Sequence, residues 1–270
     1  MKKVLYMVTI VLLLAVFCFS GFQVVNYFVE SKAQAEQFDE LAALKDKATE
    51  NTEALQNTEA TEDATEPSEE TEPTGETEPT ILPEYAELYE MNNDLAGWIK
   101  IEGTEVDYPV MYTPTNPDYY LKRNFFGEDS ARGCIFAEDE CDVNLPSDNI
   151  TIYGHNMMDG SMFNNLLRYD EKKTWEKNSI IQFDTLYEKH EYQIFAVFKT
   201  TASIGEGFKY HRFVDAENEE DFNNFVDTCK KLAFYDTGIT PEYGDKIICL
   251  STCEYTLTNG RLVVAAMRIS

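Results

Sequence analysis

The chain has 270 residues and a formal net charge of -27 at pH 7, with 49 acidic residues against 22 basic ones. That length allows one sizeable domain with additional segments. No segment is basic enough to follow a phosphate backbone, so the composition argues against nucleic acid as a partner.

The N-terminal segment is predicted to cross a membrane. Lys2 and Lys3 precede Val4–Val25, which is almost wholly apolar and would span roughly 33 Å as a helix. The alternative is a cleaved signal peptide, with Ala33-Gln34-Ala35 as its cleavage site. That site lies too far beyond the apolar run, which itself exceeds the usual hydrophobic region of about 7–15 residues. We therefore predict a single-pass anchor over residues 1–29, with its N-terminus cytoplasmic and the rest of the chain extracytoplasmic.

Two segments are predicted to connect this anchor to a folded domain. Residues 30–48 have a helix-favouring composition and are interpreted as a juxtamembrane segment with helical character. Residues 49–82 repeat the pair Thr-Glu and gain prolines late in the run. Such a segment has almost nothing to bury, so it is predicted to be a disordered linker. The folded domain would then occupy residues 83–270.

Short strands separated by Gly, Pro and Asn turns predominate in residues 83–270. This pattern predicts a mostly β domain, a barrel or a sandwich, with flanking helices. The longest helical pattern lies in a long connection before the last two strands, and connections of that length are often functional. Strands are expected at 98–101, 108–112, 133–137, 149–153, 179–183, 191–199, 246–253 and 262–266, and helices at 84–93, 162–168 and 216–234.

Cys253 ends one apolar run and Arg261 begins the next. If these two strands pair, the thiol and the guanidinium lie side by side at one rim of a sheet, where scaffolds commonly present functional residues. A lone Cys is more often an inert core residue. The polar Ser251-Thr252 step and the nearby cation favour a chemical role here.

The chain has three histidines. His190 is expected to be exposed at a hairpin turn, and His211 lies in a polar-aromatic loop that could line a groove. His155 follows the strand at 149–153 and Gly154, and its position alone leaves structural and catalytic roles open. A Cys and a His at the ends of different strands make an activatable nucleophile, because imidazolium favours the thiolate and can protonate a leaving amine. Arg261 could hold a carbonyl oxygen as negative charge builds on it.

Three motifs carry a resemblance to a known family: Thr151-Ile-Tyr-Gly-His-Asn-Met157, Leu250-Ser-Thr-Cys253 and Gly260-Arg-Leu-Val-Val264. Together they resemble the His, Cys and Arg motifs of sortases, most closely the class B sortases of Gram-positive bacteria. The resemblance covers about residues 84–270. One departure is Cys249, which stands where a Thr commonly opens the Cys motif.

The resemblance implies an eight-stranded β-barrel with flanking helices and a membrane-anchored cysteine transpeptidase. By this resemblance Cys253 cleaves the C-terminal sorting signal of secreted proteins after Thr, through a thioester. His155 then protonates the leaving amine, Arg261 stabilises the oxyanion, and an amine of a peptidoglycan precursor or a pilin lysine takes the protein. Neither a metal nor an organic cofactor is required. Ser251, Thr252, Asn156 and Phe208 are expected to contact substrate.

Two alternatives remain at this point. One is a secreted Cys/His peptidase or amidase that acts by hydrolysis, which an assay with and without an amine acceptor distinguishes. The other is a non-catalytic, sortase-like surface scaffold, against which the intact His, Cys and Arg argue. The spacing of Cys134 and Cys141 leaves open whether they form a disulfide.

Overall fold

The computed structural model describes residues 2–59 and 79–270, and the chain divides into two compact units between Leu41 and Ala42. The first unit lies within helix α1, Lys2–Glu59. The apolar part of this helix is long enough to cross a membrane, and its large apolar side chains are exposed. It is therefore a candidate membrane span.

Helix α1 extends further than the sequence predicted. The predicted disordered linker began at residue 49, whereas the structure is helical through Glu59. Residues 49–59 contain neither Gly nor Pro and include good helix formers such as Ala54 and Leu55. The hydroxyls of Thr49 and Thr52 donate to carbonyls four residues earlier, which accommodates them in the helix. The rest of the predicted linker, residues 60–78, lies outside the described residues.

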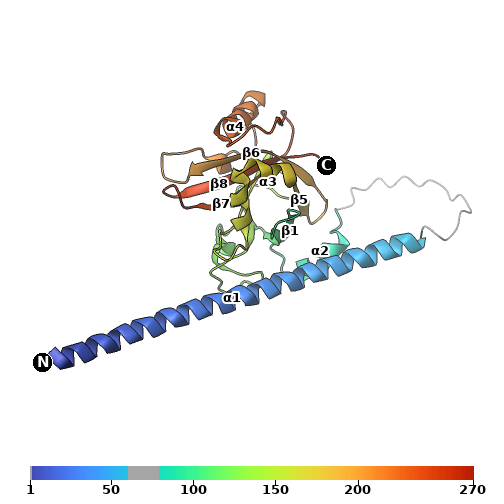
Figure 1. Ribbon diagram of the computed structural model, residues 1–270. Coiled ribbons are helices and arrows are strands. Elements are labelled where there is room, and N and C mark those ends of the chain that lie inside the picture. The colour runs from blue at the N-terminus through green and yellow to red at the C-terminus, as the bar shows by residue number, and fades with distance from the viewer. Residues whose placement is uncertain (1, 60–78) are drawn as a thin grey trace, which may run out of the picture. The chain divides into compact units, whose positions relative to one another are not determined.

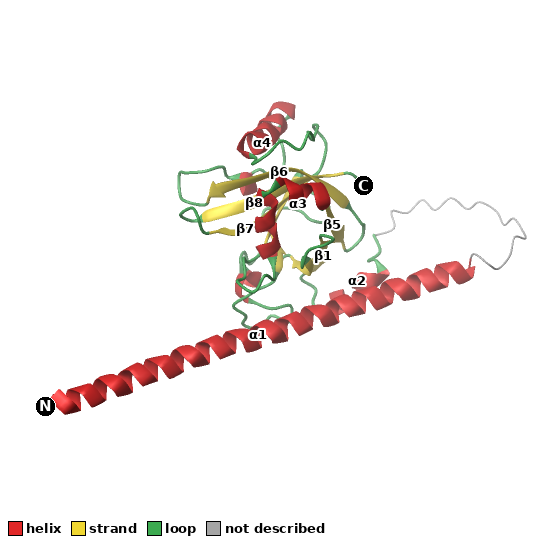
Figure 2. Ribbon diagram, in the orientation of Figure 1, coloured by secondary structure: helices red, strands yellow, loops and turns green. Residues whose placement is uncertain are grey.

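The second unit contains a closed β-barrel, as Figures 1 and 2 show. In the described part of the chain eight strands close it in the order β1-β2-β3-β4-β7-β8-β6-β5, which confirms the predicted fold. The strands are β1 Leu95–Lys100, β2 Asp107–Met111, β3 Ile135–Ala137, β4 Asn149–Tyr153, β5 Ile180–Thr185, β6 Glu191–Thr201, β7 Ile247–Glu254 and β8 Gly260–Arg268. The helices are α2 Pro83–Met91, α3 Lys172–Lys177 and α4 Glu219–Leu232, with 3-10 turns η1 Tyr119–Lys122, η2 Phe163–Asp170 and η3 Tyr210–Arg212.

The pairing of β4 with β7 decides where the site lies. These two strands run parallel, with Asn149 opposite Ile247 at one end and Tyr153 opposite Ser251 at the other. Their carboxyl ends therefore reach the same rim of the barrel. Strand β8 follows β7 in the chain and pairs with it in antiparallel orientation, so the first residues of β8 lie at that rim as well.

Helix α4 lies over β6 on the outside of the barrel (Figure 1). Its N-terminus is capped by Asn218, whose side chain accepts from the backbone N–H of Asp221. Acidic residues in its first turn and lysines in its last turn complement the helix dipole. Its buried face, Phe222, Phe225, Val226 and Cys229, joins the apolar cluster formed with β6, β7 and β8.

Two local expectations are corrected by the structure. His190 is only 7% exposed rather than solvent-facing, because its carbonyl accepts from Phe183 N–H and its ring packs edge-on against Tyr192. The helical pattern at 162–168 forms the 3-10 turn η2 rather than an α-helix. The open question about Cys134 and Cys141 is answered: both are buried thiols that are not joined in a disulfide.

Candidate active site

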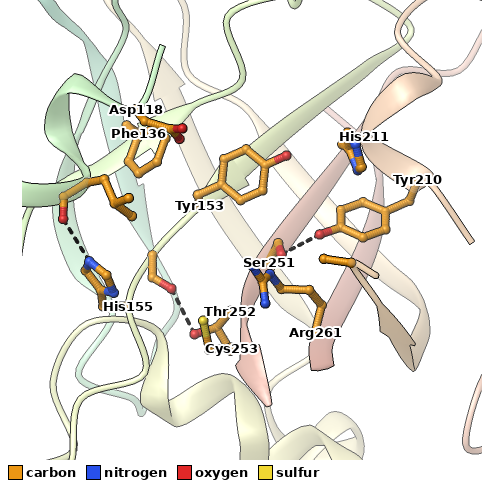
Figure 3. Close-up of a pocket in the computed structure, with 13 residues that line it drawn as sticks. Asp118, Phe136, Tyr153, His155, Tyr210, His211, Ser251, Thr252, Cys253 and Arg261 are labelled. Carbon is orange, nitrogen blue, oxygen red and sulfur yellow. Dashed lines mark hydrogen bonds between the residues drawn. The ribbon is translucent and has the colours of Figure 1, made fainter. Parts of the chain in front are cut away.

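A cavity of about 330 Å³ opens at the barrel rim where β4, β7 and β8 meet (Figure 3). Residues from these strands form one part of its wall, and the η1 and η3 regions contribute further residues. The lining residues are Asp118, Leu121, Phe136, Tyr153, Gly154, His155, Ala202, Tyr210, His211, Ser251, Thr252, Cys253 and Arg261.

The predicted pairing of Cys253 with Arg261 is confirmed by the register of β7 and β8, in which the two residues are direct partners. The strand leading to Cys253 is buried, with Ser251 1% exposed and Thr252 2% exposed. Cys253 itself is partly exposed, unlike Cys134, which is fully buried. The rigid β7 strand thus delivers one accessible thiol to the cavity.

His155 reaches the cavity because the chain turns directly after β4. A Cβ atom at Gly154 would lie 2.5 Å from Ile135 Cδ1 and 2.6 Å from Phe163 Cγ, so a larger residue at this turn would force these side chains to move. The His155 Nε2 atom lies 2.8 Å from the carbonyl oxygen of Leu121 (Figure 3). Because a carbonyl can only accept, Nε2 carries a hydrogen and Nδ1 is the ring nitrogen that gains or loses the exchangeable proton.

The turn after β4 is tied to β7 by three hydrogen bonds. Gly154 N–H donates to the Ser251 carbonyl over 3.1 Å, and the Thr252 hydroxyl donates to the Gly154 carbonyl over 2.8 Å. The Asn156 amide donates to the Cys253 carbonyl over 2.9 Å. Gly154 and Asn156, the neighbours of His155 in the chain, are therefore hydrogen-bonded to the last residues of β7, including Cys253 itself.

Two tyrosines add polar groups to the cavity wall. The hydroxyl of Tyr210 lies 2.5 Å from the Ser251 hydroxyl, and burial raises the pKa of Tyr210. The hydroxyl of Tyr153 donates to a carboxyl oxygen of Glu138, and burial raises the pKa of Tyr153 as well. Both phenols therefore stay neutral, as hydrogen-bonding groups, at physiological pH.

The carboxyl of Glu138, which accepts from Tyr153, makes the stability of the fold depend on pH. Burial raises the pKa of Glu138 to about 7, and repulsion by Asp139 and Glu140 adds to the rise, while the hydrogen bond from Tyr153 opposes it. The folded protein therefore holds this proton more tightly than the unfolded chain, for which the ordinary value is 4.5. The stability that the proton contributes is present at low pH and is lost as pH rises through about 7.

We expect Glu138→Gln to weaken this pH dependence. The difference in melting temperature, wild type minus Glu138→Gln, should decrease as the pH is raised from 5 to 8, because only the wild type must lose the Glu138 proton over that interval. Thermal unfolding at several pH values measures this. Glu176→Gln, an exposed change on α3 at a residue that is not among the charges raising the Glu138 pKa, should keep the wild-type pH profile. Equal profiles for wild type and Glu138→Gln would contradict the expectation.

The structure brings most of the predicted site residues together. His155, Cys253, Arg261, Ser251 and Thr252 all line the cavity, and so does His211, as its loop suggested.

Two residues that were expected to contact substrate lie outside the cavity lining. Asn156 does not line the cavity but bonds to the Cys253 carbonyl. Phe208 packs against Phe198 and Phe225, with ring centroids 5.9 Å and 5.6 Å apart, in the cluster beneath α4. The aromatic loop thus contributes Tyr210 to the cavity in place of Phe208.

Sequence reasoning missed several lining residues, among them Leu121, Tyr153 and Tyr210. Tyr153 could have been found, because it ends the same strand that leads to His155. Leu121 acts through its backbone carbonyl, which no side-chain pattern reveals. Tyr210 lies in an irregular connection, where neighbouring aromatic residues give no alternation that separates inward-facing from outward-facing ones.

Comparisons with known proteins point to one family. A family model described as the sortase domain matches residues 99–269. Sortase B of Staphylococcus aureus is 30% identical over 272 residues, which cover 98% of this chain and 97% of that protein. Sortase B of Listeria monocytogenes is 30% identical over 255 residues, covering 93% and 91% respectively.

Solved structures give the same result. A Staphylococcus aureus sortase B–substrate complex superposes with a TM-score of 0.64 at 35% identity, covering 70% of this chain and 86% of that one. Sortase B from Bacillus anthracis in complex with AAEK1 gives a TM-score of 0.63 at 32% identity, covering 72% and 88%. With the matched family model, these similarities show that the chain belongs to the sortase family, as a class B cysteine transpeptidase.

Proposed function

We propose that this sortase is membrane-anchored, cleaves a C-terminal sorting signal of secreted proteins after Thr, and transfers the protein to an amine. The observation that carries the proposal is that Cys253, His155 and Arg261 line the same cavity. The parallel β4–β7 pair and the antiparallel β7–β8 pair bring these three residues to one rim. A thiol, an imidazole and a guanidinium are the groups that acyl transfer through a thioester requires.

In the proposed first half-reaction the thiolate of Cys253 attacks the Thr carbonyl carbon, and the carbonyl electron pair moves onto oxygen. As the C–N bond breaks, His155 donates the Nδ1 proton to the departing amine, and a thioester remains on Cys253. In the second half an acceptor amine attacks the thioester carbonyl and loses a proton to the neutral His155. The C–S bond breaks and the Cys253 thiolate returns.

Arg261 is proposed to hold the substrate carbonyl as negative charge builds on its oxygen. One of its terminal nitrogens donates to the Gly260 carbonyl over 3.0 Å, which fixes the guanidinium at the β8 rim. A guanidinium offers five donors in a rigid fork, so a side chain held in this way retains donors for a substrate oxygen.

We expect Arg261→Ala to reduce kcat/KM about 10²-fold, the scale of losing one oxyanion donor. Arg261→Lys should recover only part of the loss, because an ammonium keeps the charge but not the fork. Steady-state cleavage of a sorting-signal peptide measures both variants. Arg212→Ala, an exposed arginine just beyond the cavity-lining His211, is the control and should stay within about twofold of wild type. Equal losses of kcat/KM for Arg212→Ala and Arg261→Ala would contradict a specific role of Arg261 at the substrate oxygen.

The proposed location follows from the first unit. The apolar part of α1 anchors the chain with its N-terminus in the cytoplasm and the barrel outside. Secreted proteins and amine acceptors, either a peptidoglycan precursor or a pilin lysine, meet the cavity there. The segment between α1 and the barrel domain is proposed to act as the spacer.

The experiment that tests the function uses the full chain in detergent micelles with a library of fluorogenic sorting-signal peptides. Each peptide is incubated with and without oligoglycine or a lysine-containing peptide, and products are identified by mass. Transpeptidation predicts a product that joins the peptide, cut after Thr, to the acceptor. Cleavage that yields only the free acid at every acceptor concentration would instead favour a hydrolase.

A further inference from the structure

The side chain of Asn156 bridges two parts of the site that lie far apart in sequence. Its Nδ2 atom donates to the Cys253 carbonyl over 2.9 Å. Its Oδ1 atom accepts from Asn164 Nδ2 over 2.7 Å. A continuous chain of hydrogen bonds therefore runs from Asn164 through Asn156 to the backbone of Cys253.

The position of Asn156 in the chain makes this bridge relevant to His155. The two residues are adjacent, and the loop that follows them is closed where Phe163 N–H donates to the His155 carbonyl over 2.9 Å. Asn156 also pairs with Met162 through an isolated antiparallel bridge. The backbone at His155 and Asn156 is thus held firmly, so a bond from Asn156 to Cys253 fixes the distance between the two chain segments.

Asn164 determines which way the Asn156 amide faces. An Asn amide presents a donor at one end and an acceptor at the other. The Cys253 carbonyl can only accept, so the bond exists only when Nδ2 faces it. The Asn164 donor needs an acceptor, and it stabilises the arrangement in which Oδ1 faces Asn164.

We propose that Asn156, oriented by Asn164, is a positioning residue that sets the separation of the His155 imidazole from the Cys253 thiol. The inference rests on the proposed function, in which Cys253 attacks and His155 donates the proton. Both ends of the Asn156 amide are engaged with protein groups, and it does not belong to the cavity lining. We therefore assign Asn156 to alignment of the catalytic pair and not to substrate contact.

The proposal predicts an effect on the rate of chemistry rather than on binding. Without the bond, His155 and Cys253 spend less time in the reactive arrangement, while the groups that hold the peptide are unchanged. We expect Asn156→Ala to lower kcat about tenfold, the scale of one lost hydrogen bond to a well-placed group, with KM within about twofold. Asn156→Asp, nearly the same shape, keeps the acceptor for Asn164 but loses the donor, so its kcat should fall at least as far.

A double-mutant cycle tests whether Asn164 acts through Asn156. Asn164→Ala should lower kcat by about threefold in the wild type and have no further effect when Asn156 is already Ala, because the two residues form one chain. The matched control is Asn165→Ala. Asn165 is the next residue on η2, is 2% exposed and donates to the Gly160 carbonyl over 2.8 Å, so it holds the same loop without reaching Cys253.

The measurements are steady-state kinetics on one sorting-signal peptide and thermal unfolding of each variant, with the full chain in detergent micelles. Asn165→Ala is expected to lower the melting temperature and to leave kcat within about twofold. The proposal is overturned if Asn156→Ala and Asn156→Asp raise KM with kcat unchanged, if Asn165→Ala lowers kcat as much as they do, or if the Asn156 and Asn164 effects multiply. Activity in Cys253→Ala would instead overturn the proposed function on which the inference rests.

Discussion

Replacing Cys253 with alanine is expected to reduce kcat/KM for a sorting-signal peptide at least about 10⁴-fold, because covalent catalysis loses its nucleophile. The fold should be retained, since Cys253 is a partly exposed residue near the end of β7 and the substitution removes a single sulfur atom. In the wild type, intact mass under denaturing quench should show an acyl group on Cys253. That adduct should be labile to hydroxylamine, as a thioester is, and absent from Cys253→Ala.

Cys249→Ala is the matched control, because Cys249 lies on the same strand and is fully buried. Burial raises the pKa of the Cys249 thiol well above its usual range, and Cys229 and Cys141 add to the rise, so it is an unreactive core thiol. Removing it should cost stability through a small cavity and leave kcat/KM within a few-fold. Iodoacetamide should likewise label Cys253 in the folded protein and reach Cys249 only after unfolding. Persistent activity in Cys253→Ala, or equal loss in both variants, would place the nucleophile elsewhere.

The Cys253–Arg261 pair was predictable from the sequence because it depends on local information. Two apolar, β-branched runs separated by a short polar stretch form a hairpin, and its register follows from where the runs end. The position of His155 at the end of a strand was equally visible. The parallel pairing of β4 with β7 was not visible, because it joins segments about a hundred residues apart and no local pattern encodes such a contact.

The remaining misses have a common cause. Lys189 and Glu191 flank His190 and indicate an exposed turn, yet its carbonyl pairs with Phe183 N–H of β5 and the residue is only 7% exposed. Phe208 and Tyr210 lie in one irregular loop and both pack in the cluster that contains the α4 residues, and it is the Tyr210 hydroxyl that reaches Ser251. Composition and periodicity describe how a segment folds by itself; they do not specify which neighbour covers it.

Replacing His155 with glutamine is expected to lower kcat/KM for an amide substrate by about 10²–10⁴-fold, the range for losing a general acid. Nε2 is engaged with the Leu121 carbonyl, so the proton that His155 gives to the leaving amine is the one on Nδ1. Glutamine keeps polar atoms in a similar position but cannot deliver a proton near neutral pH. A peptide with an ester in place of the scissile amide needs less help from an acid, because an alkoxide leaves far more readily than an amine anion.

The comparison of the two substrates therefore separates proton donation from other roles of His155. If His155 mainly protonates the leaving group, the fold loss of kcat/KM caused by His155→Gln should be smaller for the ester than for the amide, by about tenfold or more. His211→Gln is the matched control, because His211 lines the same cavity and belongs to η3 instead of the turn after β4. Its kcat/KM should stay within a few-fold for both substrates. An equal loss of kcat/KM for the amide and the ester would contradict the assignment of His155 as the proton donor. It would show instead that His155 acts before the C–N bond breaks, by holding Cys253 in its reactive state.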